Sequence, residues 1–508
     1  MALGKFRVNE ALFVFLLVAS GLVSLVVVLF GYFFNISKAG PYASQRIILA
    51  LVLGLHSAAS LLAYAVGSRS GFFSLFKLTL PTLLLSSAFL ILALPFRNSE
   101  YVWVEPGMYA LFFLASCLGG VVLARVGART DYLRMFLLCI AGCSIIYGLS
   151  SFTFYLFSIL DRNPDIGNYI PYGFDNIRYW SHIATWCLPL LPLAALDGPL
   201  SHVRAWRIAI LLGAGMWWWM LLLSTARGSI LGIAFGVLLV GLIFGKRVLP
   251  WLKVLLMHVA FGGLFWVLLS VAIPLWVFQG EAQVKVFDTG DSGRLPMFIE
   301  AWQMSIQNIP YGMGPQSWLT HQILTDVYAE SVKFGHPHNM YLLWAAEYGW
   351  ALVLFMGIMV LQAAYYFWKK RAALLNFTDA GTSGKQLLYL VAFTASASGA
   401  LFHAGVSAVF VAPGSMLVGL HILIAYWALI APENIATPYK PQSPERFKLN
   451  LKIGVLLFAI LCFCWLIWLK EVSIYYEDMR EDSKSFYYED VGVGTFPRFW
   501  LHGNFPRQ

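Results

Sequence analysis

Charged side chains are scarce in this sequence, since Asp, Glu, Lys and Arg make up 12% of its 508 residues. Soluble proteins carry about 25%, whereas 59% of this chain is hydrophobic and its mean hydropathy is +0.72. Ionisable side chains are almost missing from the interiors of its long apolar runs, although ion-coupled transporters usually need them there. The composition therefore excludes an ordinary soluble enzyme and argues against a pump or secondary transporter.

Alternating strand segments and loop cysteines are also missing. Segments of about ten alternating polar and apolar residues, the signature of a membrane β-barrel, do not occur. None of the six cysteines lies in an outer turn, where an oxidising compartment could pair it. All six fall inside apolar runs: Cys117, Cys139, Cys143, Cys187, Cys462 and Cys464. They are expected to be small buried hydrophobic side chains rather than disulfides or metal ligands.

The chain does contain many apolar runs of membrane length. A helix needs about 20 apolar residues to cross the hydrocarbon core, and unpaired backbone groups in lipid exclude irregular spans. Thirteen runs qualify: 11–34, 47–66, 77–95, 108–124, 135–160, 179–196, 207–226, 229–244, 252–278, 340–368, 387–407, 412–430 and 451–469. The sequence predicts an all-α, polytopic integral membrane protein with about 12–13 transmembrane helices. The first run lacks an A-x-A-like cleavage site and is expected to remain as an anchor.

The basic residues predict the orientation of these spans, because short cytoplasmic loops are enriched in Lys and Arg. With the N-terminus inside, 20 of the 34 Lys and Arg residues fall on the cytoplasmic side. The net charge of +9 then orients the protein against the anionic inner leaflet and gives no support to nucleic-acid binding.

The chain divides into four predicted segments. Transmembrane helices occupy 1–278, a large outer loop 279–339, further transmembrane helices 340–469, and a polar, aromatic and acidic tail 470–508. The tail is expected to be solvated or to lie on the surface without catalytic work. The loop is the expected place for chemistry, because functional groups concentrate on loops held by a rigid scaffold.

A helix is predicted near the middle of this loop. Its apolar face, with helical spacing, consists of Leu295, Ile299, Trp302 and Ile306. Ser292 can cap the helix and Pro296 is tolerable in its first turn, while the turn residues of 310–315 end it. The helix is expected to rest on the membrane domain with Arg294 in its opening turn.

Two arginines are candidates for binding an anion. Arg294 lies at a helix N-terminus, where free N–H groups attract phosphate; the alternative is a salt bridge to Asp288 or Asp291. Arg227 lies between two spans beside Gly228, where an ionisable group is a functional hypothesis by default; the alternative is an arginine that reaches lipid headgroups.

The end of the loop carries a candidate base. His338 directly precedes a span, and an imidazole can accept a proton from an attacking hydroxyl. A zinc site built from His336 and His338 with His321 lacks a firm third and fourth ligand at the usual spacing. Glu347, nine residues further on, is about half a turn out of phase and is only a possible supporting residue.

Other arginines and histidines receive plainer interpretations. For four arginines in the outer turns, lipid headgroup contact is the better expectation: Arg46, Arg97, Arg162 and Arg178. Five lone histidines in or beside the spans are expected to be packed or interfacial: His56, His182, His258, His403 and His421.

Five short motifs, taken in order, resemble the O-antigen ligase and polymerase superfamily. They are Arg227-Gly228, Ser292-Gly293-Arg294, Pro310-Tyr311-Gly312-Met313-Gly314, His338-Asn339-Met340-Tyr341-Leu342 and Glu347-Tyr348-Gly349. The motifs cover about 224–350, and the span layout matches over the remainder. The thirteenth apolar run departs from the twelve-span layout of these ligases and leaves open the side on which the tail lies.

The resemblance implies a multi-pass protein of the bacterial inner membrane with a cytoplasmic N-terminus and a periplasmic active site. Such an enzyme is an inverting, metal-independent glycosyltransferase that moves O-antigen from undecaprenyl diphosphate to lipid A-core in lipopolysaccharide biosynthesis. It would need neither cofactor nor nucleic acid, and its partners would be these two lipid-linked substrates and membrane lipids. By the resemblance, Arg227 and Arg294 would hold the diphosphate and His338 would be the catalytic base, with His336, Asn339 and Glu347 as possible supporting residues.

Three alternatives remain open. An O-antigen polymerase and a protein O-oligosaccharyltransferase share these motifs and differ in the acceptor. A flippase for lipid-linked glycans would need no base, so His338→Ala would leave it working.

Overall fold

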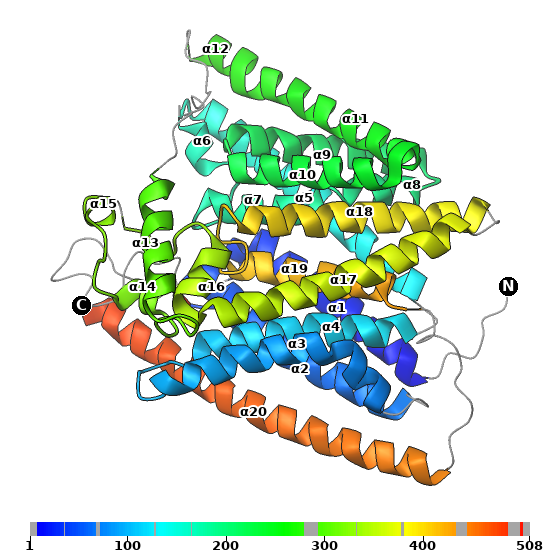
Figure 1. The fold of residues 1–508 in the computed structure, drawn as a ribbon. Coiled ribbons are helices and arrows are strands. Elements are labelled where there is room, and N and C mark those ends of the chain that lie inside the picture. The colour runs from blue at the N-terminus through cyan, green and yellow to red at the C-terminus, as the bar shows by residue number, and fades with distance from the viewer. Residues whose placement is uncertain are drawn as a thin grey trace.

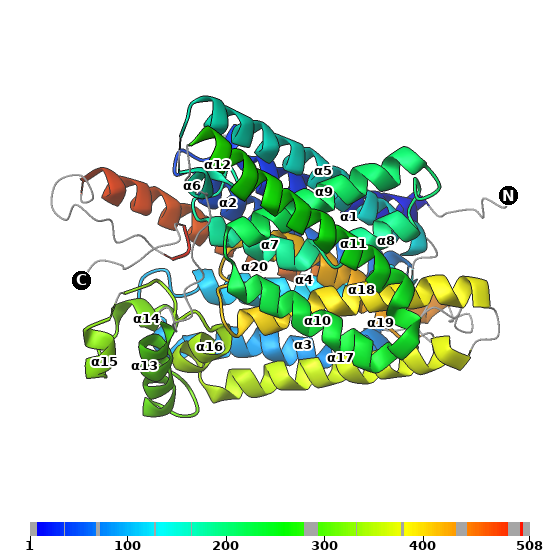
Figure 2. The same cartoon turned by 90° about the horizontal axis from the view of Figure 1, so that it is seen from above.

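The computed structural model describes residues 8–34, 36–67, 72–125, 129–163, 165–278, 293–331, 333–376, 380–432, 444–485 and 498–500. Over these ranges the regular structure is entirely helical, with no strand. The long helices lie side by side in a single bundle (Figure 1, Figure 2). This confirms the predicted all-α class.

The helices fall into two groups, before and after Arg294. The first group is α1 (Val8–Phe30), α2 (Pro41–Gly67), α3 (Phe72–Ala93), α4 (Val104–Arg125), α5 (Arg129–Leu160), α6 (Ile166–Tyr169), α7 (Ile177–Cys187), α8 (Leu191–Leu196), α9 (Arg204–Leu223), α10 (Arg227–Phe244), α11 (Leu249–Phe265) and α12 (Ile273–Val277). The second group is α13 (Arg294–Gln307), α14 (Ser317–Thr320), α15 (Asp326–Ala329), α16 (Met340–Tyr348), α17 (Trp350–Asn376), α18 (Ala380–Ala404), α19 (Pro413–Ile430) and α20 (Pro444–Ser485). Short turns of other helix types are η1 (Gly31–Phe33), η2 (Leu94–Phe96), η3 (Gly245–Val248) and the π-helical η4 (Trp266–Ala272).

Eleven stretches of the described chain are long and apolar enough to cross a membrane. One of them, Arg227–Val277, has 51 residues, and a straight helix of that length would span about 75 Å. The hydrocarbon core is only about 30 Å thick. The stretch is in fact two helical arms, α10 and α11 to α12, because η3 reverses the chain between them (Figure 1). The protein is therefore a multi-pass membrane protein.

Two predicted spans are not continuous helices. The run 179–196 is broken between α7 and α8, since Pro189 and Pro192 cannot donate to the helical ladder. The buried carbonyl of Pro189 accepts a hydrogen bond from Trp251 Nε1 at 2.9 Å, which satisfies this backbone group inside the bundle. The run 340–368 is broken at Gly349, whose φ is +86°, so α16 is a separate short helix.

Glycines allow α10 and α18 to pack closely. A Cβ added to Gly232 would lie 2.6 Å from the Gly399 carbonyl oxygen, and one added to Gly236 would lie 2.2 Å from that of Ala395. Small residues at this spacing let membrane helices approach backbone to backbone. The packing fixes the N-terminal end of α10, where Arg227 lies, against the C-terminal end of α18.

The bundle has two distinct ends. One end, called the loop face, carries α13 to α16 and the C-terminal end of α20 (Figure 1). The N-terminal end of α1 lies at the other end, the opposite face. The predicted span parity is thus reproduced within the molecule, including the placement of the tail on the side of the loop.

The helix α20 continues well beyond the predicted end of the membrane segment at 469. It runs to Ser485, and its last part buries Val472, Tyr475 and Met479. The Tyr475 ring stacks on Tyr101 at a centroid distance of 4.1 Å. The tail was expected to be solvated or to lie on the surface, and this part of α20 lies on the surface of the loop face through its aromatic side chains.

The helix α13 begins at Arg294 and lies across the ends of the spans, as predicted for a helix on the membrane domain (Figure 1). Its packing face differs from the prediction: Leu295, Trp302 and Ile306 are exposed, whereas the opposite face, with Met297 and Glu300, is buried. The predicted apolar face is thus turned away from the bundle. Ser292, Asp288 and Asp291 lie outside the described residues.

Candidate active site

A cavity of about 290 Å³ lies at the loop face. Four parts of the chain build its wall: the start of α7, the start of α13, the loop before α16 and the turn between α18 and α19. The lining residues are Asn176, Arg178, Tyr179, His182, Arg294, Phe334, Gly335, His336, His338, Ser407 and Ala408. No Asp or Glu is among these described lining residues, so the cavity suits an anion.

Arg294 and Arg178 meet in this cavity, and Arg227 lies near both. Partial burial lowers the pKa of the Arg294 guanidinium, and the charges of Arg178 and Arg227 lower it further. The pKa of Arg178 is lowered first by burial and then by Arg227. Arg178 and Arg294, which both line the cavity, repel each other, and a bound anion would relieve that repulsion.

Each of these arginines lies in the first turn of a helix, and the residues beside it in the sequence fix its position there. Arg178 is fixed in the first turn of α7, where its backbone N–H donates to the Asn176 side chain at 2.9 Å, an N-cap of the ordinary kind. Arg294 opens α13 behind Gly293, which has a φ of +68°. Arg227 opens α10, and Gly228 beside it leaves room for His403: a Cβ there would lie 2.8 Å from His403 Nε2.

His338 lies in the cavity wall in a strained conformation. Its φ is +57°, in the left-handed region that non-glycine residues rarely adopt. Residues held in such strained conformations are concentrated at functional sites. Among the described residues its Nδ1 has no hydrogen-bond partner. Burial, followed by the charges of Arg294 and Arg178, lowers the pKa of His338 to about 3. The imidazole is therefore neutral at pH 7 and has a nitrogen able to accept a proton.

His336 lies beside His338 and helps to hold its backbone. The two rings are 4.4 Å apart, and the His338 backbone N–H donates to His336 Nδ1 at 3.1 Å. Asn339 plays a different part, since its side chain caps α16 by accepting the N–H groups of Tyr341 and Leu342, both at 3.0 Å. The structure thus brings His336 into the cavity and places Asn339 just behind it.

Glu347 lies away from the cavity, in a buried charge cluster with Glu105 and Arg498. Arg498 Nε donates to Glu105 Oε1 at 2.9 Å, and its Nη2 donates to Glu347 Oε2 at 3.0 Å. Burial raises the pKa of Glu347 to about 7, although Arg498 opposes the shift. Two carboxyl groups facing one guanidinium balance their charge when one of them keeps a proton.

This cluster connects the C-terminal residues to the loop that carries His338. Arg498 Nη1 lies 3.4 Å from the Gly335 carbonyl oxygen, and Glu347 Oε1 accepts the Trp318 N–H at 3.3 Å. The backbone of 498–500 is held in turn, since Arg46 Nε donates to the Phe499 carbonyl at 2.7 Å. Arg46 is 1% exposed, so the expectation that it contacts lipid headgroups is wrong.

The remaining loop is organised by a second buried carboxylate, Glu300. It accepts hydrogen bonds from His321 Nε2 at 2.8 Å and from the Leu324 N–H at 2.7 Å. His321 is thereby directed toward α13 and not toward His336 and His338. In the described part of the chain no group of three or more His, Cys, Asp or Glu side chains is arranged to hold a metal ion.

The motifs at 310–314 and 347–349 form one contact. The Met313 and Gly314 N–H groups donate to the carbonyls of Ala346 and Glu347 at 2.8 and 2.9 Å. A Cβ added to Gly349 would lie 1.9 Å from the Pro310 carbonyl oxygen. These glycines therefore allow the loop to lie directly on the end of α16, which positions the segment that ends in His338.

Other expectations can also be compared with the structure. All six cysteines are free, but the predicted burial holds only for Cys117, Cys143 and Cys187, since Cys139 and Cys462 are half-buried and Cys464 is exposed. His56 and His421 pack against each other at a ring distance of 5.1 Å, whereas His182 lines the cavity and its Nε2 lies 2.8 Å from Ser407 Oγ.

Arg178, His182 and Arg498 are the site residues that sequence reasoning missed. Arg178 and His182 precede the loop 279–339 by about a hundred residues, and only the packing of α7 brings them to it. One signal was available for Arg178, because span parity already placed it on the same side as Arg294.

The helical bundle and the cationic cavity define a class: a multi-pass membrane protein with an arginine-lined cavity at one end of its bundle. Residues 208–357 match the family model described as O-antigen ligase. This match is consistent with membership of the chain in the O-antigen ligase superfamily. The match includes Arg227, Arg294 and His338. No curated protein matches the chain.

Proposed function

We propose that this protein is an O-antigen ligase that transfers a glycan from undecaprenyl diphosphate to lipid A-core. The observation that supports this most is the meeting of Arg178, Arg294 and His338 in one cavity. Cationic side chains suit the diphosphate of the donor, and a neutral imidazole suits the hydroxyl of the acceptor.

In the proposed reaction, Arg178 and Arg294 bind the diphosphate, and Arg227 adds positive charge nearby. The acceptor hydroxyl oxygen forms a bond to the anomeric carbon, whose bond to the diphosphate oxygen breaks. The diphosphate leaves with the bonding electron pair, and His338 takes the hydroxyl proton. A single displacement of this kind inverts the anomeric carbon, and neither a metal nor a nucleotide takes part.

The low pKa of His338 gives the proposal a further feature. In the free protein burial lowers the pKa of His338 most, and the nearby guanidinium groups of Arg294 and Arg178 lower it further. A diphosphate carries one negative charge on each phosphate and would offset those guanidinium charges, so its binding raises the pKa of His338. The histidine thus becomes a stronger base when the donor is present.

The experiment combines purified protein, undecaprenyl-diphosphate glycan and lipid A-core, with the joined product measured by mass spectrometry. A ligase yields glycan on lipid A-core with inverted configuration. Lengthened undecaprenyl-linked chains would indicate a polymerase instead, and a glycosylated protein acceptor would indicate a protein O-oligosaccharyltransferase. A product that retains the anomeric configuration would contradict the single displacement.

A further inference from the structure

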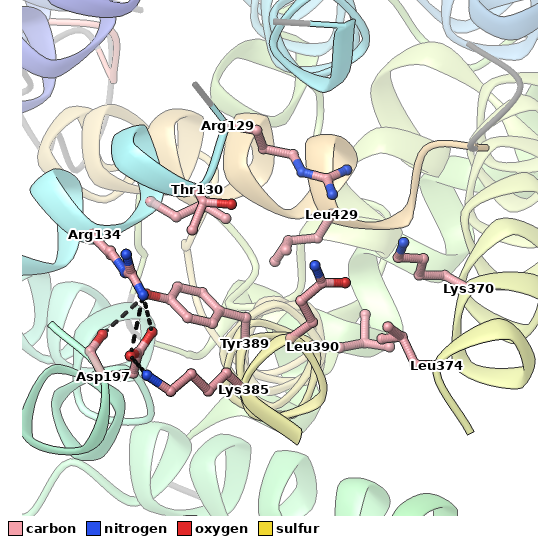
Figure 3. Close-up of a pocket in the computed structure, with 12 residues that line it drawn as sticks. Arg129, Thr130, Arg134, Asp197, Lys370, Leu374, Lys385, Tyr389, Leu390 and Leu429 are labelled. Atoms are coloured by element: carbon pink, nitrogen blue, oxygen red, sulfur yellow. Dashed lines mark hydrogen bonds and ion pairs between the residues drawn. The ribbon is translucent and has the colours of Figure 1, made fainter. Parts of the chain in front are cut away.

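A second cavity, of about 400 Å³, lies at the opposite face, far from the proposed chemistry (Figure 3). Five helices supply its wall: the start of α5, the end of α8, the end of α17, the start of α18 and the end of α19. Its lining residues are Arg129, Thr130, Leu133, Arg134, Asp197, Lys370, Leu374, Lys385, Gln386, Tyr389, Leu390 and Leu429.

The charges of this lining are unbalanced. Four of the twelve lining residues are cations and one, Asp197, is a carboxylate. The Asp197 carboxylate already forms ion pairs with Arg134 at 3.4 Å and with Lys385 at 2.9 Å. Its backbone carbonyl accepts a hydrogen bond from the Tyr389 hydroxyl at 3.0 Å. These contacts gather at one side of the cavity (Figure 3).

Arg129 and Lys370 occupy the other part of the wall. Arg129 Nη1 donates to the Ala428 carbonyl at 3.1 Å, and Arg129 lies on the side of the lining away from Asp197 (Figure 3). Lys370 is only 7% exposed, although lysine is rarely buried. The positive-inside rule accounts for basic residues at this face. Arg129 and Lys370 also interact with other groups of the protein, so a bound phosphate would add to those interactions.

The rest of the lining is apolar. Leu133, Leu374, Leu390 and Leu429 contribute side chains from four different helices. A cavity of this size is in the range of small-molecule sites, and it lies at the ends of the spans, where lipid headgroups reside. Cations beside leucines at this depth suit a ligand with a phosphate joined to a hydrocarbon chain.

We propose that this cavity binds the phosphate-bearing headgroup of an anionic membrane lipid in the leaflet at the opposite face. The phosphate lies between Arg129 and Lys370, and the first carbons of the lipid lie against the leucines. This site is separate from the diphosphate cavity at the loop face and does not depend on the function proposed above.

The test uses the purified full-length protein in detergent, with native mass spectrometry of retained lipid. Phosphatidylglycerol and phosphatidylcholine are compared at equal concentration, and inorganic phosphate and pyrophosphate are the competitors. The wild-type protein is expected to retain phosphatidylglycerol at least tenfold more tightly than phosphatidylcholine. Lys370→Gln and Arg129→Gln are each expected to reduce that preference several-fold, whereas Arg247→Gln, at an exposed cation on the same face, leaves it unchanged.

A second variant preserves every charge in case a charge variant fails to fold. Gln386→Trp fills the cavity and is expected to abolish the retention of phosphatidylglycerol. Equal retention of the two lipids by the wild-type protein would overturn the proposal, as would full retention by Gln386→Trp. Competition by millimolar inorganic phosphate with no contribution from the lipid chain would also overturn it, because the site would then bind free phosphate.

Discussion

At the scale of single residues, the environment of His338 predicts an unusual pH dependence. In the free protein its pKa is lowered to about 3, so His338 stays unprotonated throughout pH 5–8. Bound diphosphate raises that pKa, and protonated His338 cannot act as the base. We therefore expect the acidic decline of kcat to lie at higher pH than that of kcat/KM, since these two constants report the complex and the free enzyme.

The control for this prediction is His338→Ala, which is expected to lower kcat about 10²–10⁴-fold and to remove the acidic decline that belongs to His338. Equal acidic pKa values in both profiles of the wild-type enzyme would contradict the effect of the donor on His338.

Arg178 carries a second prediction at this scale. Arg178→Gln removes a guanidinium that lines the cavity, and a hydrogen bond to a charged group contributes about 1.5–3 kcal/mol. We expect the Kd for the lipid diphosphate to rise about 10–100-fold. Arg97→Gln is the matched control, because Arg97 is exposed near the loop face and lies outside the cavity lining. An equal effect of both substitutions would point to general surface charge.

At the scale of elements, the contact between the 310–314 turn and the end of α16 depends on Gly349. Its backbone, with φ +86° and ψ +169°, is open almost only to glycine, and a Cβ would collide with Pro310. Gly349→Ala should lower the free energy of unfolding by about 2–5 kcal/mol, measured as a drop in thermal midpoint. Gly357→Ala is the control, since a Cβ there meets nothing within 4 Å; a similar drop for both would refute the assignment.

The attachment of the C-terminal residues to the loop gives another element-scale prediction. Arg498→Met would leave Glu105 and Glu347 buried without their cation, and breaking a buried ion pair costs about 3–5 kcal/mol. We expect a lower thermal midpoint, with partial recovery when Glu105→Gln is added. A loss no larger than that of the exposed control Arg247→Met would show that the cluster does not hold the segment.

The whole molecule shows how far sequence reasoning reaches. The apolar runs, the helix at Arg294 and the basic residues of one face were predictable because each depends on local composition or periodicity. The helix breaks near Pro189 and at Gly349 were harder to predict, because a hydropathy average over about 20 residues does not respond to a single proline or glycine. The outward apolar face of α13 could not be predicted, because the sequence does not say which side of an amphipathic helix meets the bundle.

The candidate site was predictable in part for the same reason. Arg294 and His338 belong to one loop, and the structure does bring them together. Arg178 and Arg498 reach that loop from distant parts of the chain, through packing that no short motif records. The residue types and the resemblance therefore indicated that arginines would hold the diphosphate and that His338 would take the proton, whereas the presence of Arg178 in the cavity could be found only from the fold.

The central claim is that the cavity at the loop face binds a lipid diphosphate through arginines and activates the acceptor through His338. The most direct measurement follows donor binding and single-turnover transfer on the same preparations of wild-type protein, His338→Ala and the double variant Arg178→Gln/Arg294→Gln. We expect His338→Ala to bind undecaprenyl-diphosphate glycan like the wild type and to lose transfer, whereas the double variant loses binding at least tenfold. Wild-type binding by the double variant, or wild-type transfer by His338→Ala, would contradict the account.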